Sequence, residues 1–163
     1  MMFHVEHCKN KIMFHVKRCK GDKKMNNFMN LALKQALKAY KKQEVPIGAI
    51  IVKNGKIISK AYNKKENKKI TTKHAEIIAI EKACKKLKTW HLDGCEIYTT
   101  MEPCLMCYGA IEQSRIRKIN YGLKNMNFGF KSKYNIESKL EICECKISDE
   151  YIDCIKSFFK EKR

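Results

Sequence analysis

The chain has 163 residues, 44% of them hydrophobic, with only 7 Gly and 2 Pro, so it is long enough for one well-buried domain and too short for two. No apolar run approaches the roughly 20 residues of a membrane helix, and the N-terminal segment lacks the apolar core of a secretory signal, which predicts a cytoplasmic protein without a membrane segment. Thirty-five basic against 17 acidic residues give a net charge of +18, which favours a polyanionic partner such as nucleic acid, although the excess of lysine also fits an AT-rich genome.

A repeat stands at the N-terminus: the segment Met2–Lys9 recurs with few changes as Met13–Lys20. Two copies of this length are too few and too short for a solenoid, whose repeats have about 20 residues or more. We interpret residues 1–24 either as a disordered extension or as upstream DNA read as protein, with the native start at or near Met25. The histidines and cysteines of the repeat could also form a metal-binding tail. The folded domain is expected over residues 25–163, and a native peptide that begins at Met1 would contradict a shifted start.

An alternating α/β pattern follows. Apolar residues recur at helical spacing in the first element, and Asn54-Gly55 between two apolar, β-branched runs predicts a hairpin because both residues tolerate positive φ. The lysine-rich segment 64–73 is expected to be a loop, and Ser148 followed by two acids is typical of a helix start. The expected elements are helix 26–42, strands 47–52 and 57–61, helix 74–88, strand 96–100, helix 104–113, strands 118–121 and 140–146, and a last helix after Ser148. This order predicts one mixed sheet between helices.

Nine cysteines in a chain without a secretory signal indicate reduced thiols, since an odd number cannot all pair within the molecule. Cys104 and Cys107 are the pair whose spacing suits a metal ion. The others are expected to pack as small side chains, including the two thiols of Cys143-Glu144-Cys145 on one face of a strand. These packing cysteines are Cys84, Cys95, Cys143, Cys145 and Cys154.

Two motifs, His74-x-Glu76 and Pro103-Cys104-x-x-Cys107, carry the chemistry. The cysteines are three residues apart and share a face on a helix, and Pro103 is expected at the first helical position, where no N–H is needed. With His74 at the start of another helix they predict a zinc site that has three protein ligands and an open fourth position, as a catalytic site requires. Such a site lowers the pKa of a bound water from about 15.7 toward roughly 7. Glu76 is expected beside the metal, as an acid and base and not as a ligand.

These motifs resemble those of the bacterial tRNA-specific adenosine deaminases, within the cytidine deaminase superfamily. The resemblance begins near Met29 and continues to the C-terminus, with the shared blocks in the same order. The blocks are Glu44–Ala49, His74–Ile77, Thr100–Cys104, Gly109–Ile111, Ser114–Ile116 and Phe158-Phe159.

The resemblance implies a cytidine deaminase-like fold, a three-layer α-β-α sandwich with a central mixed five-stranded sheet. It also implies a homodimer in which His74, Cys104 and Cys107 bind one zinc ion per subunit, Glu76 transfers protons, and Asn63 hydrogen-bonds the flipped base. The family converts the wobble adenosine, position 34, of an arginine tRNA to inosine, and its C-terminal helix helps to hold the anticodon stem-loop. At that helix Phe158 and Phe159 fit a place in the core equally well.

Three departures from the family concern loops and packing rather than zinc chemistry. Ile70–Lys73 stands where Asp-Pro-Thr often precedes the histidine, Tyr108 replaces a small residue, and Asn125–Asn127 lies in a shortened loop. The substrate is therefore the open question. The enzymatic alternative is a deaminase of a free base or nucleotide such as guanine or cytosine, and the non-enzymatic one is a basic RNA-binding module with structural zinc.

Overall fold

A computed structural model describes residues 23–162 of the chain. The repeat and most of the predicted extension lie outside these residues, and Met25 falls in the first turn of α2. Within residues 23–162 no helix has the length and hydrophobicity of a membrane span. The elements are α2 (Lys23–Lys41), β1 (Gly48–Lys53), β2 (Lys56–Tyr62), α3 (Lys65–Lys68), α4 (Ala75–Leu87), β3 (Cys95–Met101), α5 (Leu105–Gln113), β4 (Lys118–Leu123), β5 (Glu141–Glu144) and α6 (Asp149–Glu161).

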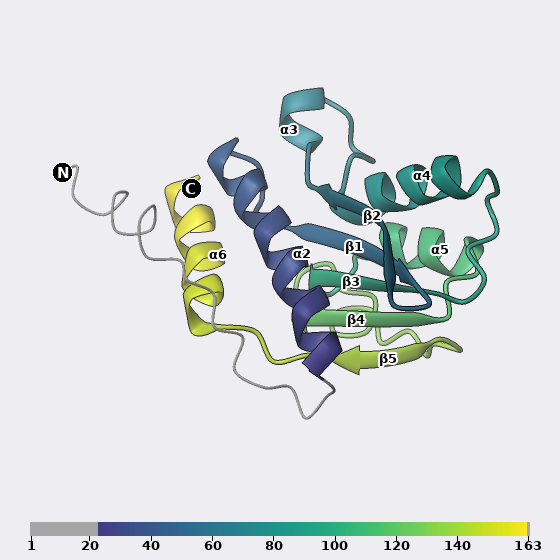
Figure 1. Cartoon of the computed structure of the whole chain (residues 1–163). Coiled ribbons are helices and arrows are strands. Elements are labelled where there is room, and N and C mark those ends of the chain that lie inside the picture. The colour runs from purple at the N-terminus through teal and green to yellow at the C-terminus, as the bar shows by residue number, and fades with distance from the viewer. Residues whose placement is uncertain (1–22, 163) are drawn as a thin grey trace.

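The five strands form one mixed sheet in the order β2-β1-β3-β4-β5. β1 pairs antiparallel with both β2 and β3, whereas the β3–β4 and β4–β5 pairs are parallel. Helices α2 and α6 lie on one side of the sheet and α4 and α5 on the other (Figure 1). The predicted three-layer α-β-α sandwich with a mixed five-stranded sheet is therefore confirmed.

The core lies on both faces of the sheet. One cluster of buried residues joins the sheet to α4 and α5, and two others join it to α2 and α6. The closest approach is at Gly48, where an added Cβ would lie 2.1 Å from the backbone oxygen of Ala32. Glycine at this position therefore lets α2 pack directly on β1.

The β1–β2 hairpin is confirmed, but the loop after it is partly helical. Asn54 and Gly55 adopt φ angles of 48° and 70°, as the turn requires. In the segment predicted as a loop, the short helix α3 forms because the N–H groups of Glu66 and Asn67 donate to the carboxylate of Glu44. That acceptor lies more than 20 residues earlier in the chain, so the lysine-rich local sequence gives no sign of it.

Helix α6 is anchored by its first turn. Ser148 caps it by accepting a hydrogen bond from the backbone N–H of Tyr151, as predicted. The buried hydroxyl of Tyr151 lies 2.7 Å from the carbonyl oxygen of Pro46 and 2.8 Å from Oγ1 of Thr100. Near the other end, Phe158 is buried whereas Phe159 is 46% exposed, so the two phenylalanines divide between core and surface.

Candidate active site

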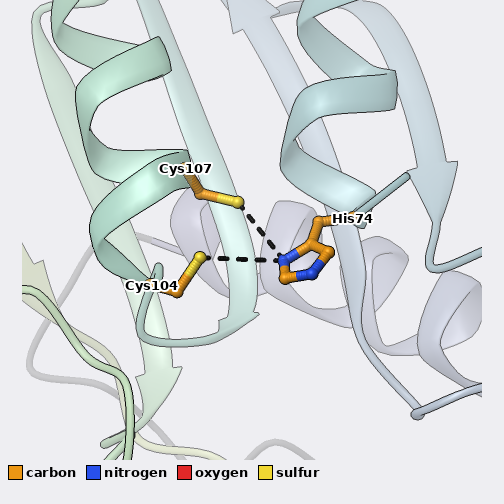
Figure 2. A group of neighbouring side chains, drawn as sticks. All are labelled: His74, Cys104 and Cys107. Atoms are coloured by element: carbon orange, nitrogen blue, oxygen red, sulfur yellow. Dashed lines mark hydrogen bonds between the residues drawn. The ribbon is translucent and has the colours of Figure 1, made fainter. Parts of the chain in front are cut away.

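Two helix starts converge on one group of side chains (Figure 2). His74 is the N-cap of α4 and Cys104 is the N-cap of α5, both with extended backbone angles, while Cys107 lies in the first turn of α5. Helix α5 thus begins one residue later than predicted, and Pro103 precedes the helix instead of occupying its first position. The reason is an isolated antiparallel bridge between Cys104 and Gly129, which holds the backbone of Cys104 extended.

The spacing of the three predicted ligands fits a zinc ion. Nδ1 of His74 lies 3.7 Å from Sγ of Cys104 and 3.6 Å from Sγ of Cys107. Zinc–sulfur and zinc–nitrogen bonds at a tetrahedral angle separate S and N by about 3.6 Å. Within residues 23–162 no other group of His, Cys, Asp and Glu side chains has a metal-binding arrangement. The donor set of two thiols and an imidazole is therefore suited to zinc in both chemistry and distance.

Cys104 and His74 favour their charged forms, whereas the hydrogen bond to Cys104 and burial raise the pKa of the Cys107 thiol. The thiol of Cys107 donates to Cys104 and lowers the pKa of Cys104 to about 4, with His74 acting in the same direction against burial. The resulting thiolate raises the pKa of His74 above its usual value. Because both cysteines and His74 lie at helix N-termini, the exposed N–H groups there further favour anionic sulfur.

Glu76 is buried next to this group. Its side chain lies in the first turn of α4, is 3% exposed, and has an Oε2 atom without a hydrogen-bond partner among the described residues. Burial raises the pKa of this carboxyl to about 7, whereas a nearby cation would lower it again. A buried carboxyl oxygen that lacks a partner is available to water or substrate, as an acid and base must be.

Asn63 is held by the buried carboxylate of Glu44. Nδ2 of Asn63 donates to Oε2 of Glu44 at 3.1 Å, and both side chains are buried. Since an ionised carboxylate only accepts, the contact fixes which way the amide of Asn63 faces and turns Oδ1 away from Glu44. The backbone N–H of Lys64 donates a hydrogen bond to the carbonyl oxygen of Lys73 and closes the following loop. Asn63 precedes the first of these two residues and His74 follows the second, so both lie at the base of the loop.

In the sequence, Glu44 stands out only as the first residue of the block Glu44–Ala49, which resembles the deaminases. A lone acid between a helix and a Val-Pro pair carries no local sign of burial, yet this side chain is 0% exposed. Besides Asn63 and the N–H of Glu66, it accepts from both the backbone and the side-chain nitrogen of Asn67, each at 2.7 Å. It therefore connects the end of α2 to Asn63 and to α3.

A second buried carboxylate, Glu102, holds the loop after β4. It accepts hydrogen bonds from the backbone N–H groups of Asn125, Lys131 and Ser132 at 2.8–3.0 Å. Gly129 is needed here, because an added Cβ would lie 2.6 Å from the Glu102 carboxyl group. The departure at Asn125–Asn127 thus belongs to a loop that is fixed beside Cys104 by an internal anchor.

The departure at Tyr108 also has a structural explanation. Its ring stacks on Phe130 of the same loop, with centroids 4.4 Å apart and an interplanar angle of 11°. Its hydroxyl donates to Oγ of Ser138 at 3.0 Å. The larger side chain is accommodated by the loop that follows β4.

None of the remaining described cysteines forms a disulfide: Cys84, Cys95, Cys143, Cys145 and Cys154. Cys95, Cys145 and Cys154 are buried, and the other two are half-buried. This distribution agrees with the predicted packing role.

Comparison with known proteins identifies the family. Residues 22–123 match the model of the cytidine and deoxycytidylate deaminase zinc-binding region. The tRNA-specific adenosine deaminase of Aquifex aeolicus is 50% identical over 110 residues, which cover 67% of this chain and 73% of that protein. The enzyme of the same name from Bacillus subtilis is 38% identical over 145 residues, covering 83% of this chain and 89% of the relative.

Solved structures of deaminases also resemble this chain. A structure from studies of A-to-I editing by tRNA A34 deaminases at the wobble position has a TM-score of 0.70 and 35% identity, covering 72% of this chain and 96% of its own. A guanine deaminase from Bacillus subtilis has a TM-score of 0.60 and 29% identity, covering 82% of this chain and 92% of its own. The chain therefore belongs to the cytidine and deoxycytidylate deaminase family and is a deaminase, with bacterial tRNA-specific adenosine deaminases among its relatives.

Proposed function

We propose that the protein is a zinc-dependent tRNA deaminase of the cytoplasm that hydrolyses adenosine 34 to inosine and ammonia, in an arginine tRNA. The observation that carries this proposal is the buried Glu76 beside His74, Cys104 and Cys107, in a chain that is 50% identical to a tRNA-specific adenosine deaminase over 110 residues. The net charge of +18 supports a polyanionic substrate. Membership of a deaminase family removes the non-enzymatic alternative.

His74, Cys104 and Cys107 would hold one zinc ion per chain. When bound, zinc supplies Lewis-acid chemistry that makes a water molecule acidic enough to attack at neutral pH. Glu76 then accepts a proton from the attacking water, delivers it to a nitrogen of the adenine ring, and passes the second proton to the departing amine. Its burial keeps bulk water from competing for these protons.

Asn63 would orient the base. With one Nδ2 hydrogen donated to Glu44, the amide has Oδ1 and its other Nδ2 hydrogen left for the substrate. An amide presented in this way matches the paired donor and acceptor on an adenine edge. Glu44 contributes by fixing the amide, not by touching the base.

Substitution Glu44→Gln should lower kcat/KM by about 10-fold or more, because an amide brings N–H groups against Asn63 and Asn67, and a hydrogen bond to a charged group contributes about 1.5–3 kcal/mol. Most of the change should be in KM, with zinc content unchanged, as measured by steady-state kinetics and elemental analysis. The matched control, Glu137→Gln on an exposed glutamate, should stay within about 2-fold of the wild type. A Glu44→Gln enzyme with wild-type KM would show that Asn63 does not depend on this anchor.

We propose that the protein forms a homodimer whose interface is an exposed apolar surface beside the active site. Leu105 and Met106 at the start of α5 are 44% and 37% exposed, and Met126 and Phe128 in the loop after β4 are 66% and 63% exposed. The bridge between Cys104 and Gly129 places these two segments side by side. Exposed apolar residues gathered in this way are typical of an interface. Sedimentation should give twice the 19.1 kDa chain mass, and a monomer at micromolar concentrations would refute the dimer.

The deciding experiment uses purified, zinc-loaded protein and total tRNA from a host that lacks the activity. Sequencing should reveal inosine at the wobble position of an arginine tRNA. A parallel panel contains free guanine, cytosine and adenosine, with guanine included because of the structural likeness to a guanine deaminase. Turnover of a free base without conversion of any tRNA would overturn the proposal.

A further inference from the structure

A basic cleft is lined by Tyr62, the residue before Asn63, and by residues of α3. Helix α3 projects from the rest of the molecule (Figure 1). The volume of the cleft is about 260 Å³, and its walls come from the residue that follows α2, the last residue of β2, and the start and first turn of α3. The lining residues are Lys42, Tyr62, Lys64, Asn67 and Lys68. No part of the proposed deamination chemistry uses them.

Among the described residues, no ion pair neutralises the positive charge of this cleft. Within residues 23–162, none of its three lysines lies within ion-pair distance of a carboxylate. The ammonium groups of Lys42 and Lys64 lie 5.6 Å and 5.0 Å from the centroid of the same Tyr62 ring. Two cations near one ring, with a third lysine in the lining of the same cleft, attract an anion.

The cleft is also fixed relative to Asn63. Asn67 donates its side-chain N–H groups to the carbonyl oxygen of Lys42 at 3.2 Å and to Oε1 of Glu44 at 2.7 Å. The same carboxylate accepts from Asn63. One buried anchor therefore sets the position of both the cleft and the side chain proposed to bind the base, and Tyr62 and Asn63 are consecutive residues.

We infer that this cleft is a phosphate subsite that binds an RNA backbone phosphate next to the nucleotide entering the active site. The inference rests on the proposed function, because it takes the substrate to be a polynucleotide. A phosphodiester in the cleft would contact lysine ammonium groups while its neighbouring base is at Asn63. The phosphate of a free nucleotide or inorganic phosphate has the same chemistry, so the experiment must separate these sources.

The test couples a change in the RNA to a change in the protein. Full-length, zinc-loaded enzyme is titrated with fluorescent anticodon stem-loops in which the phosphate on either side of the target adenosine is replaced, one at a time, by an uncharged methylphosphonate. For one of the two positions the wild type should lose about 10-fold in affinity, as expected for a lost charged hydrogen bond. Lys64→Ala/Lys68→Ala should bind the normal RNA about 10-fold more weakly and show less than about a 2-fold further loss with the methylphosphonate.

Two matched variants complete the design. Lys56→Ala/Lys85→Ala removes one lysine at the start of β2 and one near the end of α4. This variant should show the full loss of affinity with the methylphosphonate. Lys64→Arg/Lys68→Arg keeps the positive charge and should also show the full loss of affinity with the methylphosphonate. In salt titrations, the slope of log affinity against log salt should become shallower by about 0.7 per lost contact in the alanine variant. Circular dichroism and zinc content establish that each variant is folded.

The outcomes separate the subsite from the function. The subsite would be overturned if, at both positions, the methylphosphonate reduced RNA affinity equally in the wild type and in Lys64→Ala/Lys68→Ala. This outcome would stand even if the wild type still formed inosine. Competition by inorganic phosphate at constant ionic strength, together with no methylphosphonate effect, would assign the cleft to free phosphate instead. A wild type that binds but never converts the stem-loop would overturn the proposed function.

Discussion

Glu76→Gln should reduce kcat for deamination by about 10²–10⁴-fold, the range typical of a lost general acid and base. The amide has nearly the same volume as the carboxyl group and fits the same buried place, but it cannot accept a proton from water. Zinc content and RNA affinity should remain close to wild type, because Glu76 is not one of the three predicted ligands and its side chain is buried away from the outer surface. Single-turnover assays and elemental analysis measure the two properties separately.

The control for this substitution is Glu81→Gln, on an exposed residue of the same helix, which should change kcat by less than about 2-fold. Wild-type turnover by Glu76→Gln would refute the assignment of Glu76 as the proton-transfer group. Loss of zinc along with activity would show that Glu76 supports the metal site and does not transfer protons.

Removal of the metal should have the other large effect. Treatment with a strong chelator should reduce turnover by several orders of magnitude, because neutral water is a far weaker nucleophile without a Lewis acid. It should also lower Tm, since a ligand that binds only the folded chain stabilises it. Adding zinc should restore both, with the titration ending at one ion per chain.

Cys107→Ser tests the same site through the protein. Cys107 is buried in the first turn of α5, and serine preserves its shape while removing the soft sulfur ligand that zinc prefers. Zinc content and turnover should both fall sharply. Cys84→Ser, at a half-buried cysteine near the end of α4, should retain full zinc and activity. A Cys107→Ser protein with one tightly bound zinc and normal turnover would remove this residue from the ligand set.

The parts of the fold that could be predicted from sequence are those set by neighbouring residues. Asn54-Gly55 determines its hairpin through the φ angles that its own residues tolerate, and Ser148 caps α6 within one turn. The convergence of His74 with the two cysteines could be anticipated because one zinc ion needs ligands from both motifs, although His74 and Cys104 are 30 residues apart. For the hairpin and the helix cap, the information lies within a few residues of the structure that it specifies.

The parts that could not be predicted depend on contacts distant in sequence. Helix α3 forms around the carboxylate of Glu44, and α5 starts late because Cys104 pairs with Gly129. The loop after β4 follows from hydrogen bonds to Glu102. Phe158 and Phe159 are the same residue type, and only their different positions around α6 determine that Phe158 is buried and Phe159 is exposed.

The anchor formed by Glu44 limits how substrate choice can evolve. Because one carboxylate receives hydrogen bonds from Asn63 and from α3, a substitution at Asn63 that admits a different base also takes a donor from a buried anion and disturbs the neighbouring lysines. The energetic effects of changes at these positions should be non-additive. Selection for a new base should therefore proceed through paired substitutions, with a second change at or near Glu44 accompanying the one at Asn63.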